Sequence, residues 1–536
     1  MLTRIAAWLG VGLALFGFVA VADTVILNTP GAKTGGTLVI GVSQTFWDLD
    51  PRISNSFYDG YVTGEVFDDL IALDPETLEP RPYVAKSWDV VSDKQIRFYL
   101  NQGIRFHNGE DLTAEDVAFT LNSIVDPANA SPNQTELIWM QEAIVVNSST
   151  VDILVKAEYA PYAPLFSALN LAIVPKDTVL EMGDEKFNLN PVGSGPYKFV
   201  EWITGDHITL ERNEDYWLVY PNLDKVIYRP IPTLATMMLE LEAGGVDIAD
   251  NIPAQDIARF KAMDSVNVLQ CASLSYFYLF FNMSHPPSND IRYRKAVYLS
   301  VNMDTAIYDI FQDLTGIRAY GCIPPALWAN DSQYLETNVA LSENDVRAKQ
   351  LFIQLKAQGV IPDDYQTTVY SPLDPRRTQL ATIIAESLKE NGLDARVQPL
   401  DWGPYLDLVR HSEADPLGED FDQGIIGWSG GPDPHDFLYY LLHSDNAVVG
   451  AAENLSFYMN PDADALIHAA DTTLDQMERE RLYVEAQRIC CHEYVHIPLY
   501  HLIETKGVRT RVHGFRIDPR GGIHLCDSYH NVWVKE

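Results

Sequence analysis

The sequence predicts a large α/β protein built from more than one lobe. Helical and strand-like patterns alternate along most of the chain, which is typical of α/β folds. A length of 536 residues is too great for one ordinary hydrophobic core, since domains average roughly 150 residues. A hydrophobic content of 47%, with 11% aromatic residues, excludes a disordered chain.

The first half of the chain contains short strands and capped helices. Thr113 precedes two acids and an apolar run with helical spacing up to Ile124, which is the pattern of a capped helix start. Glycine and proline at 193–196 precede two runs that predict a hairpin. The strands expected here are residues 37–42, 96–100, 197–202, 207–210 and 246–248, and a further helix is expected at 233–243.

The second half repeats this alternation. Helices are expected at 294–301, 345–358 and 378–391, and strands at 367–370 and 395–400. Residues 421–437 then run from an apolar stretch into glycines, a single indole, two prolines and three ionisable side chains. A strand that ends at a binding site exposed to solvent has this composition, so we expect a small ligand to bind there.

The first 22 residues resemble an export leader. Arg4 precedes an apolar run from Ile5 to Ala22 that carries no charge and ends in Ala-Val-Ala. An uncleaved anchor is the alternative, but no basic stop-transfer cluster follows the run. We predict cleavage after Ala22 and a soluble, exported, periplasmic mature chain.

Charge and cysteine content exclude other classes of protein. The formal net charge of −36 disfavours nucleic acid and anionic lipid as partners. Five cysteines are too few for a disulfide scaffold, and their pairing is not readable from the sequence. Residues Cys490, Cys491, His492 and His496 form a tempting cluster, but without a C-x-x-C pair we interpret them as a mixture of core and surface residues. We predict no metal and no cofactor.

Five separated motifs resemble those of the family 5 extracellular solute-binding proteins, which include dipeptide- and oligopeptide-binding proteins. Residues 103–117, Gly-Ile-Arg-Phe-His-Asn-Gly-Glu-Asp-Leu-Thr-Ala-Glu-Asp-Val, are similar to the family's signature segment. The other four motifs follow in the family's order and lie at residues 193–197, 213–217, 290–297 and 497–500. The resemblance covers nearly all of the mature chain.

The resemblance implies a two-lobed periplasmic-binding-protein architecture (type II, Venus-flytrap) with an extra inserted subdomain. Such a protein captures a ligand by lobe closure and delivers it to the permease subunits of an ABC importer; it acts as a monomer and performs no catalysis. Candidate lobe crossings are residues 276–282 and 501–508. The expected segments are 36–75, 190–278 and 507–536 for lobe I, 76–189 for the inserted subdomain and 279–506 for lobe II.

The resemblance also implies a ligand site around Trp428, on the segment Trp428-Ser429-Gly430-Gly431. In related peptide-binding proteins, a carboxylate three residues after this tryptophan pairs with the α-ammonium of the peptide. Here that position is Gly431, so either Asp433 or Asp436 supplies the charge, or the ligand has no free ammonium. By the family's geometry Ser43, Gln44 and Phe46 face Trp428 across the cleft, and Tyr276 precedes the lobe crossing.

Three functional hypotheses follow. Peptides or similar small solutes are the ligands that the family implies. An oligosaccharide or another neutral solute is the alternative, because Trp428 offers a flat apolar face and Gly431 lacks a charge. The alternative of another class is a secreted serine hydrolase, since residues 427–431 match G-x-S-x-G around Ser429. Pro432 and Pro434 argue against it, because they lie where the helix of a nucleophile elbow would begin.

Overall fold

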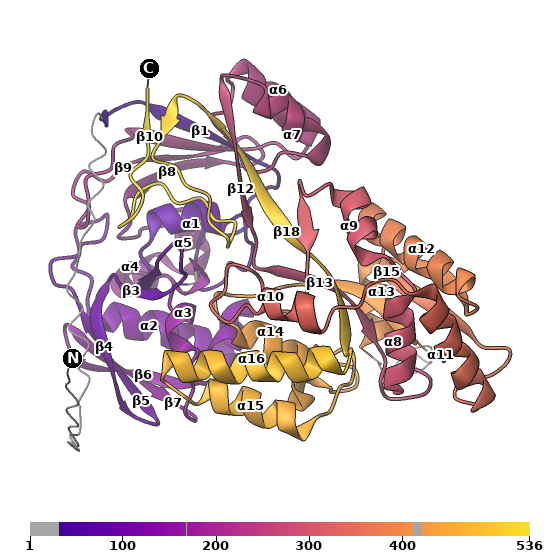
Figure 1. Cartoon of the computed structure of the whole chain (residues 1–536). Coiled ribbons are helices and arrows are strands. Elements are labelled where there is room, and N and C mark those ends of the chain that lie inside the picture. The colour runs from indigo at the N-terminus through magenta and orange to yellow at the C-terminus, as the bar shows by residue number, and fades with distance from the viewer. Residues whose placement is uncertain (1–31, 168, 411–420, 536) are drawn as a thin grey trace, which may run out of the picture.

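The computed structural model describes residues 32–167, 169–410 and 421–535. The predicted leader, with its cleavage site after Ala22, lies outside these residues. The chain folds into two lobes joined by strands that run between them, as Figure 1 shows. No helix in the described ranges is both long and apolar enough to cross a membrane.

Lobe I is built on one half of a long mixed sheet. Its strands lie in the order β11-β1-β10-β9-β8, and β1 is parallel to both of its neighbours. Leu38, Ile40 and Val42 alternate into a separate apolar core on one face of this half-sheet. Its elements are β1 (Thr37–Val42), α1 (Gly60–Val66), β8 (Tyr197–Ile203), β9 (His207–Arg212), β10 (Lys225–Pro230), α6 (Leu234–Ala243), β11 (Ile248–Ala249), α7 (Ala254–Lys261) and β12 (Val266–Ala272).

The inserted subdomain has its own antiparallel sheet, in the order β4-β5-β7-β6, and its own core. The predicted helix start at Thr113 is confirmed, since its hydroxyl accepts from the Glu115 N–H and the Asp116 carboxylate accepts from the Thr113 N–H. Its elements, with the hairpin that precedes them, are β2 (Ile71–Leu73), β3 (Pro80–Pro82), β4 (Ala85–Ser92), β5 (Gln95–Leu100), α2 (Ala114–Val125), η1 (Pro127–Asn129), η2 (Pro132–Leu137), β6 (Met140–Asn147), β7 (Thr150–Val155), α3 (Tyr162–Leu165), η3 (Leu169–Leu171), α4 (Lys176–Met182) and α5 (Asp184–Leu189).

Lobe II carries the other half of the long sheet, in the order β16-β15-β17-β13-β18. Two apolar cores lie against this half-sheet. Its elements are β13 (Ser275–Phe281), α8 (Ile291–Leu299), α9 (Met303–Phe311), β14 (Gly316–Arg318), α10 (Ser332–Asn338), α11 (Asp345–Ala357), β15 (Gln366–Pro372), α12 (Pro375–Glu390), β16 (Asp394–Leu400), α13 (Trp402–Val409), β17 (Gln423–Ser429), α14 (His435–Leu442), η5 (Ser444–Asn446), α15 (Pro461–Asp471), α16 (Gln476–His492) and β18 (His496–Arg509).

Two strand connections join the lobes. Strand β18 is continuous: its first residues pair with β13 in lobe II and its last residues pair with β12 and β11 in lobe I. The second connection runs from β12 to β13 through Ser273 and Leu274, a few residues before the range expected from the sequence. The yellow β18 in Figure 1 passes from one lobe to the other.

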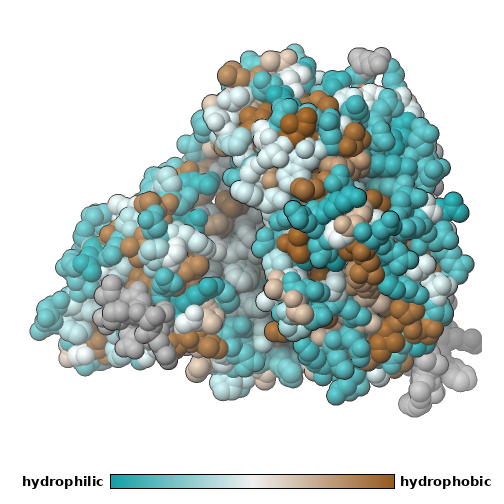
Figure 2. Space-filling model, turned by 180° about the vertical axis from the view of Figure 1, so that it is seen from behind, coloured by the Kyte–Doolittle hydropathy of each residue, from teal (hydrophilic) through white to brown (hydrophobic). Residues whose placement is uncertain are grey.

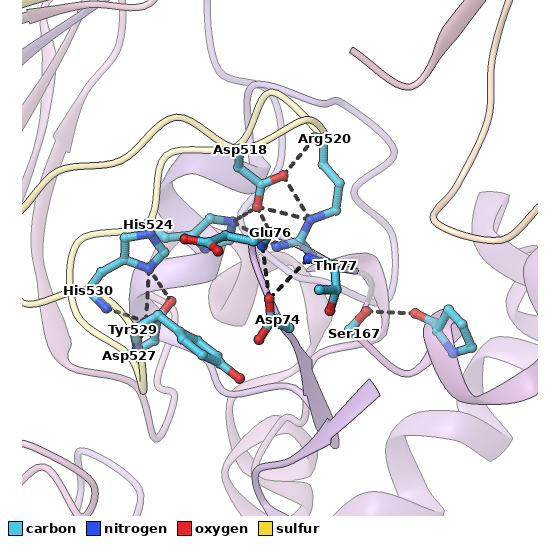
Figure 3. Close-up of polar contacts among 11 residues, drawn as sticks. Asp74, Glu76, Thr77, Ser167, Asp518, Arg520, His524, Asp527, Tyr529 and His530 are labelled. Carbon is cyan, nitrogen blue, oxygen red and sulfur yellow. Dashed lines mark hydrogen bonds and ion pairs between the residues drawn. The ribbon is translucent and has the colours of Figure 1, made fainter. Parts of the chain in front are cut away.

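The C-terminal segment returns to lobe I beside this crossing and ends in the small pair β19 (Val512–His513) and β20 (Trp533–Val534). Both carboxylate oxygens of Asp518 accept hydrogen bonds from the Arg520 guanidinium, the shortest at 2.7 Å, and Asp527 pairs with His530 at 2.8 Å (Figure 3). The Leu274 N–H donates to the Pro519 carbonyl, so this loop also contacts the connection between the lobes.

The structure contains all five cysteines as free thiols, and Cys322, Cys490 and Cys526 are buried. Every strand and helix position expected from the sequence is occupied by the corresponding element, with ends shifted by a few residues. The largest shifts are at the starts of α8 and α12, which begin three residues earlier than expected, and the short strand expected at 246–248 is β11 at Ile248–Ala249.

Candidate functional site

The carboxyl ends of the parallel strands in the two lobes face each other across the connection. In lobe I, β11 runs antiparallel to β18, so its carboxyl end points toward lobe II. In lobe II, Ser429 at the end of β17 pairs with Ser275 at the start of β13, so β17 and its parallel neighbour β15 point toward lobe I. Ligands of open α/β sheets bind outside such carboxyl ends. Figure 2 shows a deep hollow between the two lobes.

The end of β17 brings the sequence-predicted residues Trp428, Ser429, Gly430 and Gly431 to this edge. The Trp428 ring is half-buried, 5.7 Å from the Tyr440 ring, and its buried indole N–H has no hydrogen-bond partner among the described residues. Ser429 is exposed. The Gly430 N–H donates to the Leu274 carbonyl at 3.1 Å, which ties the strand end to the connection between the lobes.

Packing requires glycine immediately before Trp428. A Cβ at Gly427 would lie 2.1 Å from a ring carbon of Phe277, directly across the strand pair. Phe277 cannot retreat easily, because its ring stacks on Tyr500 at a centroid distance of 4.4 Å. The glycine therefore lets β17 approach β13 closely and fixes the position of Trp428 at the cleft edge.

Asp433, one of the two candidate acids, is already neutralised inside lobe II. Its carboxylate accepts two hydrogen bonds from Arg479 at 3.0 Å, and both side chains are 6% exposed. One of its oxygens also accepts from the His435 N–H at 3.0 Å. Asp433 thus anchors the start of α14 to α16, and its charge is not free for a ligand.

Asp436, the other candidate acid, has no cationic partner within 4 Å among the described residues. Its carboxylate accepts the Gly431 N–H at 2.6 Å. A Cβ at Gly431 would lie 2.4 Å from the same oxygen, so this carboxylate fills the space that a side chain at position 431 would need. Burial raises the pKa of Asp436 to about 6. The neighbouring His435 opposes this rise, and the carboxylates of Asp433 and Glu136 add to it.

The inserted subdomain contacts this part of lobe II. The Ala160 N–H donates to the Asp471 carbonyl at 2.6 Å, and the Tyr159 ring meets the His435 ring edge-on at 5.4 Å. The imidazole of His435 in turn bonds to the Asp471 carboxylate at 2.8 Å. The start of helix α14, which carries Asp436, therefore contacts both the rest of lobe II and the inserted subdomain.

The structure distributes the predicted residues of lobe I and of the crossing differently. The Ser43 N–H and hydroxyl both donate to Asp250, at 2.8 and 2.7 Å, and Gln44 is exposed at the end of β1. Phe46 does not reach the cleft surface; it is 4% exposed and packs against Tyr228 in the core of lobe I. Tyr276 is 1% exposed and stacks on a second tyrosine of β13 within the core of lobe II.

Two groups near the end of β1 were not among the residues predicted from the sequence. Trp47, next to Phe46, is 68% exposed. Asp250 follows β11 at the carboxyl end of a parallel strand and holds Ser43. The sequence pattern around Asp250, an acid directly after a short apolar strand, is typical of a residue at a strand end. Its position beside Ser43 follows only from the pairing of β11 with β1 and β18.

The geometry of a nucleophile elbow is absent around Ser429. Helix α14 begins only at His435, after Pro432 and Pro434, whereas an elbow needs a helix directly behind its serine. No histidine hydrogen bonds to Ser429 in the part of the chain that the structure describes. In the same ranges, no three His, Cys, Asp or Glu side chains gather closely enough to hold a metal ion, and this includes the cluster around Cys490.

Comparison with known proteins places the chain in a family. The profile of the bacterial extracellular solute-binding proteins, family 5, middle region, matches residues 79–448. The dipeptide-binding protein of Escherichia coli (strain K12) is 24% identical over 483 residues, which cover 86% of this chain and 88% of that protein.

Two solved structures share the fold. HbpA2 from Haemophilus parasuis superposes with a TM-score of 0.83 at 24% identity, covering 94% of this chain and 100% of that one. The periplasmic binding protein DppA from Helicobacter pylori, in complex with the peptide STSA, gives a TM-score of 0.73 at 25% identity, covering 94% and 99%. The sequence motifs, the two lobes around a cleft and the profile match agree: the chain belongs to the bacterial extracellular solute-binding proteins of family 5.

Proposed function

We propose that this protein captures peptides or similar small solutes that carry a free ammonium group, and that Asp436 is the acid that pairs with this group. The protein is the exported solute-binding component of an ABC importer, delivers its ligand to the permease subunits and catalyses no reaction. The observation that carries the proposal is the poorly solvated Asp436 carboxylate beside Gly431, which forms no ion pair within 4 Å with any residue that the structure describes. A ligand ammonium at Asp436 would offset the cost of that ionised group.

The position of Asp436 supports a peptide over a neutral solute. Peptide-binding members of the family carry an acid where this chain has Gly431, and the Asp436 carboxylate occupies the space beside that glycine. The acid is thus supplied from α14 instead of from the strand end. The Escherichia coli relative is named for dipeptides and the Helicobacter pylori structure holds a peptide, which is consistent with this ligand class.

The remaining ligand contacts and the chain organisation are proposals of the same kind. Trp428, Ser429 and Gly430 form the wall of lobe II, and Ser43 and Gln44 form the opposite wall. We infer lobe I from residues 36–75, 190–278 and 507–536, the inserted subdomain from 76–189, and lobe II from 279–506. Their separate sheets and cores support these ranges except at residues 275–278, which belong to β13 in the half-sheet of lobe II. The leader is cleaved after Ala22, so the mature chain begins at Asp23 in the periplasm.

Two measurements test the ligand class. Native mass spectrometry of protein purified without denaturation should show bound masses of short peptides; a sugar mass would overturn the proposal in favour of a neutral solute. Calorimetry with a panel of dipeptides to tetrapeptides should then give binding that is lost on N-acetylation. Asp436→Asn should weaken binding at least tenfold, whereas Asp462→Asn, an exposed acid of the same lobe, should leave it unchanged. Equal affinity for acetylated peptides would refute the role of Asp436.

A further inference from the structure

Three of the five cysteines come together in lobe II. Cys322 and Cys490 are buried in one apolar core of this lobe, and Cys491 follows Cys490 on α16. The other two cysteines lie in lobe I: Cys271 is on β12, and Cys526 belongs to the core of that lobe. Disulfides form and persist in the compartments that exported proteins enter. The three grouped cysteines are therefore the candidates for a bridge.

The segment that carries Cys322, residues 319–331 between β14 and α10, packs directly on α16. The Cys322 thiol and the Ile323 N–H both donate to the side-chain oxygen of Gln487, at 3.8 and 3.3 Å. A Cβ at Gly321 would lie 2.4 Å from the same oxygen, so the absence of a side chain there permits this close approach. Packing thus holds Cys322 against the helix at Gln487.

A second contact extends this interface along the helix. The Arg488 guanidinium donates two hydrogen bonds to the Asp331 carboxylate, the shorter at 2.6 Å, and lies over the Tyr334 ring at 3.8 Å. Asp331 ends the segment, and Tyr334 belongs to α10, which lies beside α16 in Figure 1. Gln487 and Arg488 therefore mark the face of α16 that the Cys322 segment covers.

Helical spacing places Cys491 on this face more fully than Cys490. Residues three and four apart share a helix face, and Cys491 stands four residues after Gln487 and three after Arg488. Cys490 stands three residues after Gln487 but only two after Arg488. The cysteine of α16 that faces the Cys322 segment is therefore Cys491.

The charged groups around the thiols agree with this assignment. Burial raises the pKa of Cys491 to about 12, and the carboxylate of Asp331, at the end of the Cys322 segment, adds to the rise. Burial also raises the pKa of Cys490, and there Asp464 of α15 is among the contributing carboxylates. Burial raises the pKa of Cys322 as well, and the neighbouring Cys491 adds more to this rise than Cys490 does.

We infer that Cys322 and Cys491 form a disulfide bond in the exported protein. The structure shows the reduced form of this pair, in which the Cys322 thiol donates to Gln487. Cys490 and Cys491 are unsuited to pair with each other, because neighbouring side chains of a helix do not face each other. The bridge joins the 319–331 segment to α16 and stiffens lobe II. The inference rests on export of the chain and is independent of the ligand that the protein binds.

The oxidation needs a disulfide as oxidant, in the form of an exchange protein or a small-molecule disulfide of the export compartment. One cysteine attacks it as a thiolate, which forms a mixed disulfide and releases the first thiol of the oxidant. The other cysteine then attacks the mixed disulfide, which closes the protein bridge and releases the second thiol. Each attacking cysteine gives its proton to the thiolate that leaves, so the protein loses two electrons and two protons and the oxidant gains them. Because burial keeps both thiols protonated in the folded chain, the exchange takes place before the core closes around them.

Alkylation of unreduced protein tests the bridge. Full-length protein, exported to the periplasm of the expression host, is unfolded in guanidinium with iodoacetamide, and its intact mass and a non-reducing peptide map are measured. Wild type should take up the label at three of its five cysteines, and at all five after prior reduction. The map should show Cys322 linked to the peptide that holds Cys491. Reduction should also lower the melting temperature by about 4 to 8 °C.

Matched serine variants identify the partner, since Cys490 and Cys491 fall in one tryptic peptide. Cys490→Ser should keep the bridge, whereas Cys491→Ser should leave every remaining cysteine open to alkylation without reduction. Labelling of all five cysteines in unreduced wild type would overturn the inference, and so would a bridge that survives in Cys491→Ser. If a variant fails to fold, fragmentation of the linked wild-type peptide identifies its bridged cysteine, and a bond to Cys490 there would equally overturn the inference.

Discussion

Replacing Asp433 by asparagine should unfold lobe II at a lower temperature without removing the ligand acid. The substitution keeps the size of the side chain and an oxygen that can accept the His435 N–H. It removes the charge that neutralises Arg479. The prediction separates the two acids that the sequence left as equal candidates, because Asp436→Asn should weaken binding without a comparable loss of stability.

The size of the effect follows from the surroundings of Arg479. After the substitution the guanidinium faces no carboxylate at position 433 and keeps neutral partners: the amide oxygen of the new side chain, the Ala470 carbonyl at 3.2 Å, the Tyr483 hydroxyl at 3.3 Å and the faces of nearby aromatic rings. Removing one partner of a buried ion pair costs about 3 to 5 kcal/mol. A lobe of roughly 230 residues has an unfolding entropy of about 0.5 kcal/mol/K, so its melting temperature should fall by about 6 to 10 °C.

Differential scanning calorimetry of ligand-free protein measures this shift. Asp462→Asn is the matched control, since an exposed substitution in the same lobe should change the melting temperature by about 1 °C at most. Adding Arg479→Met to Asp433→Asn should recover part of the loss, because no unpaired charge then remains buried. A melting temperature within about 2 °C of wild type, together with weakened peptide binding, would show that Asp433 is the ligand acid and that our assignment is wrong.

Three further outcomes are expected. The pKa of Asp436 is raised to about 6, above its unfolded value near 3.9, so affinity for a cationic ligand should fall about tenfold per pH unit as the pH drops below 6. Asp436→Asn should abolish this pH dependence. A flat wild-type profile of affinity against pH in calorimetry would contradict the prediction. Gly427→Ala should cost several kcal/mol in urea unfolding, because its Cβ would overlap the Phe277 ring; a loss below 1 kcal/mol would mean that the ring moves freely. Burial raises the pKa of Asp518, but Arg520 outweighs this effect and lowers the pKa to about 2. The carboxylate should therefore contribute about 2 kcal/mol to the free energy of unfolding above pH 4, and this contribution should be lost as the pH falls toward 2. The same loss of stability at low pH in Asp518→Asn as in wild type would refute this.

The fold was readable from local patterns because those patterns obey short-range rules. The alternation of apolar and polar residues at 96–100 and the capping sequence at Thr113 fix a strand and a helix through contacts within a few residues. The predicted position of the lobe crossing was a few residues off. The point where a strand leaves one lobe is set by the strands that pair with it and not by its own composition. We expected Phe46 to face Trp428 across the cleft, but the loop after β1 turns the Phe46 ring into the core and leaves Trp47 exposed. The direction of this side chain also depends on the packed structure and not on local sequence.

By itself, the sequence determined the family, the α/β class and the cleft-edge position of Trp428. These depend on residue types and spacing, which are written along the chain. Only the tertiary structure distinguishes the surroundings of the two acids, and on this our proposal for Asp436 depends. Asp433 meets Arg479, 46 residues later in the chain, whereas Asp436 folds back to the space beside Gly431. A carboxylate is a ligand group or a structural one according to whether a cation lies within a few ångströms, and that distance is a property of the packed molecule.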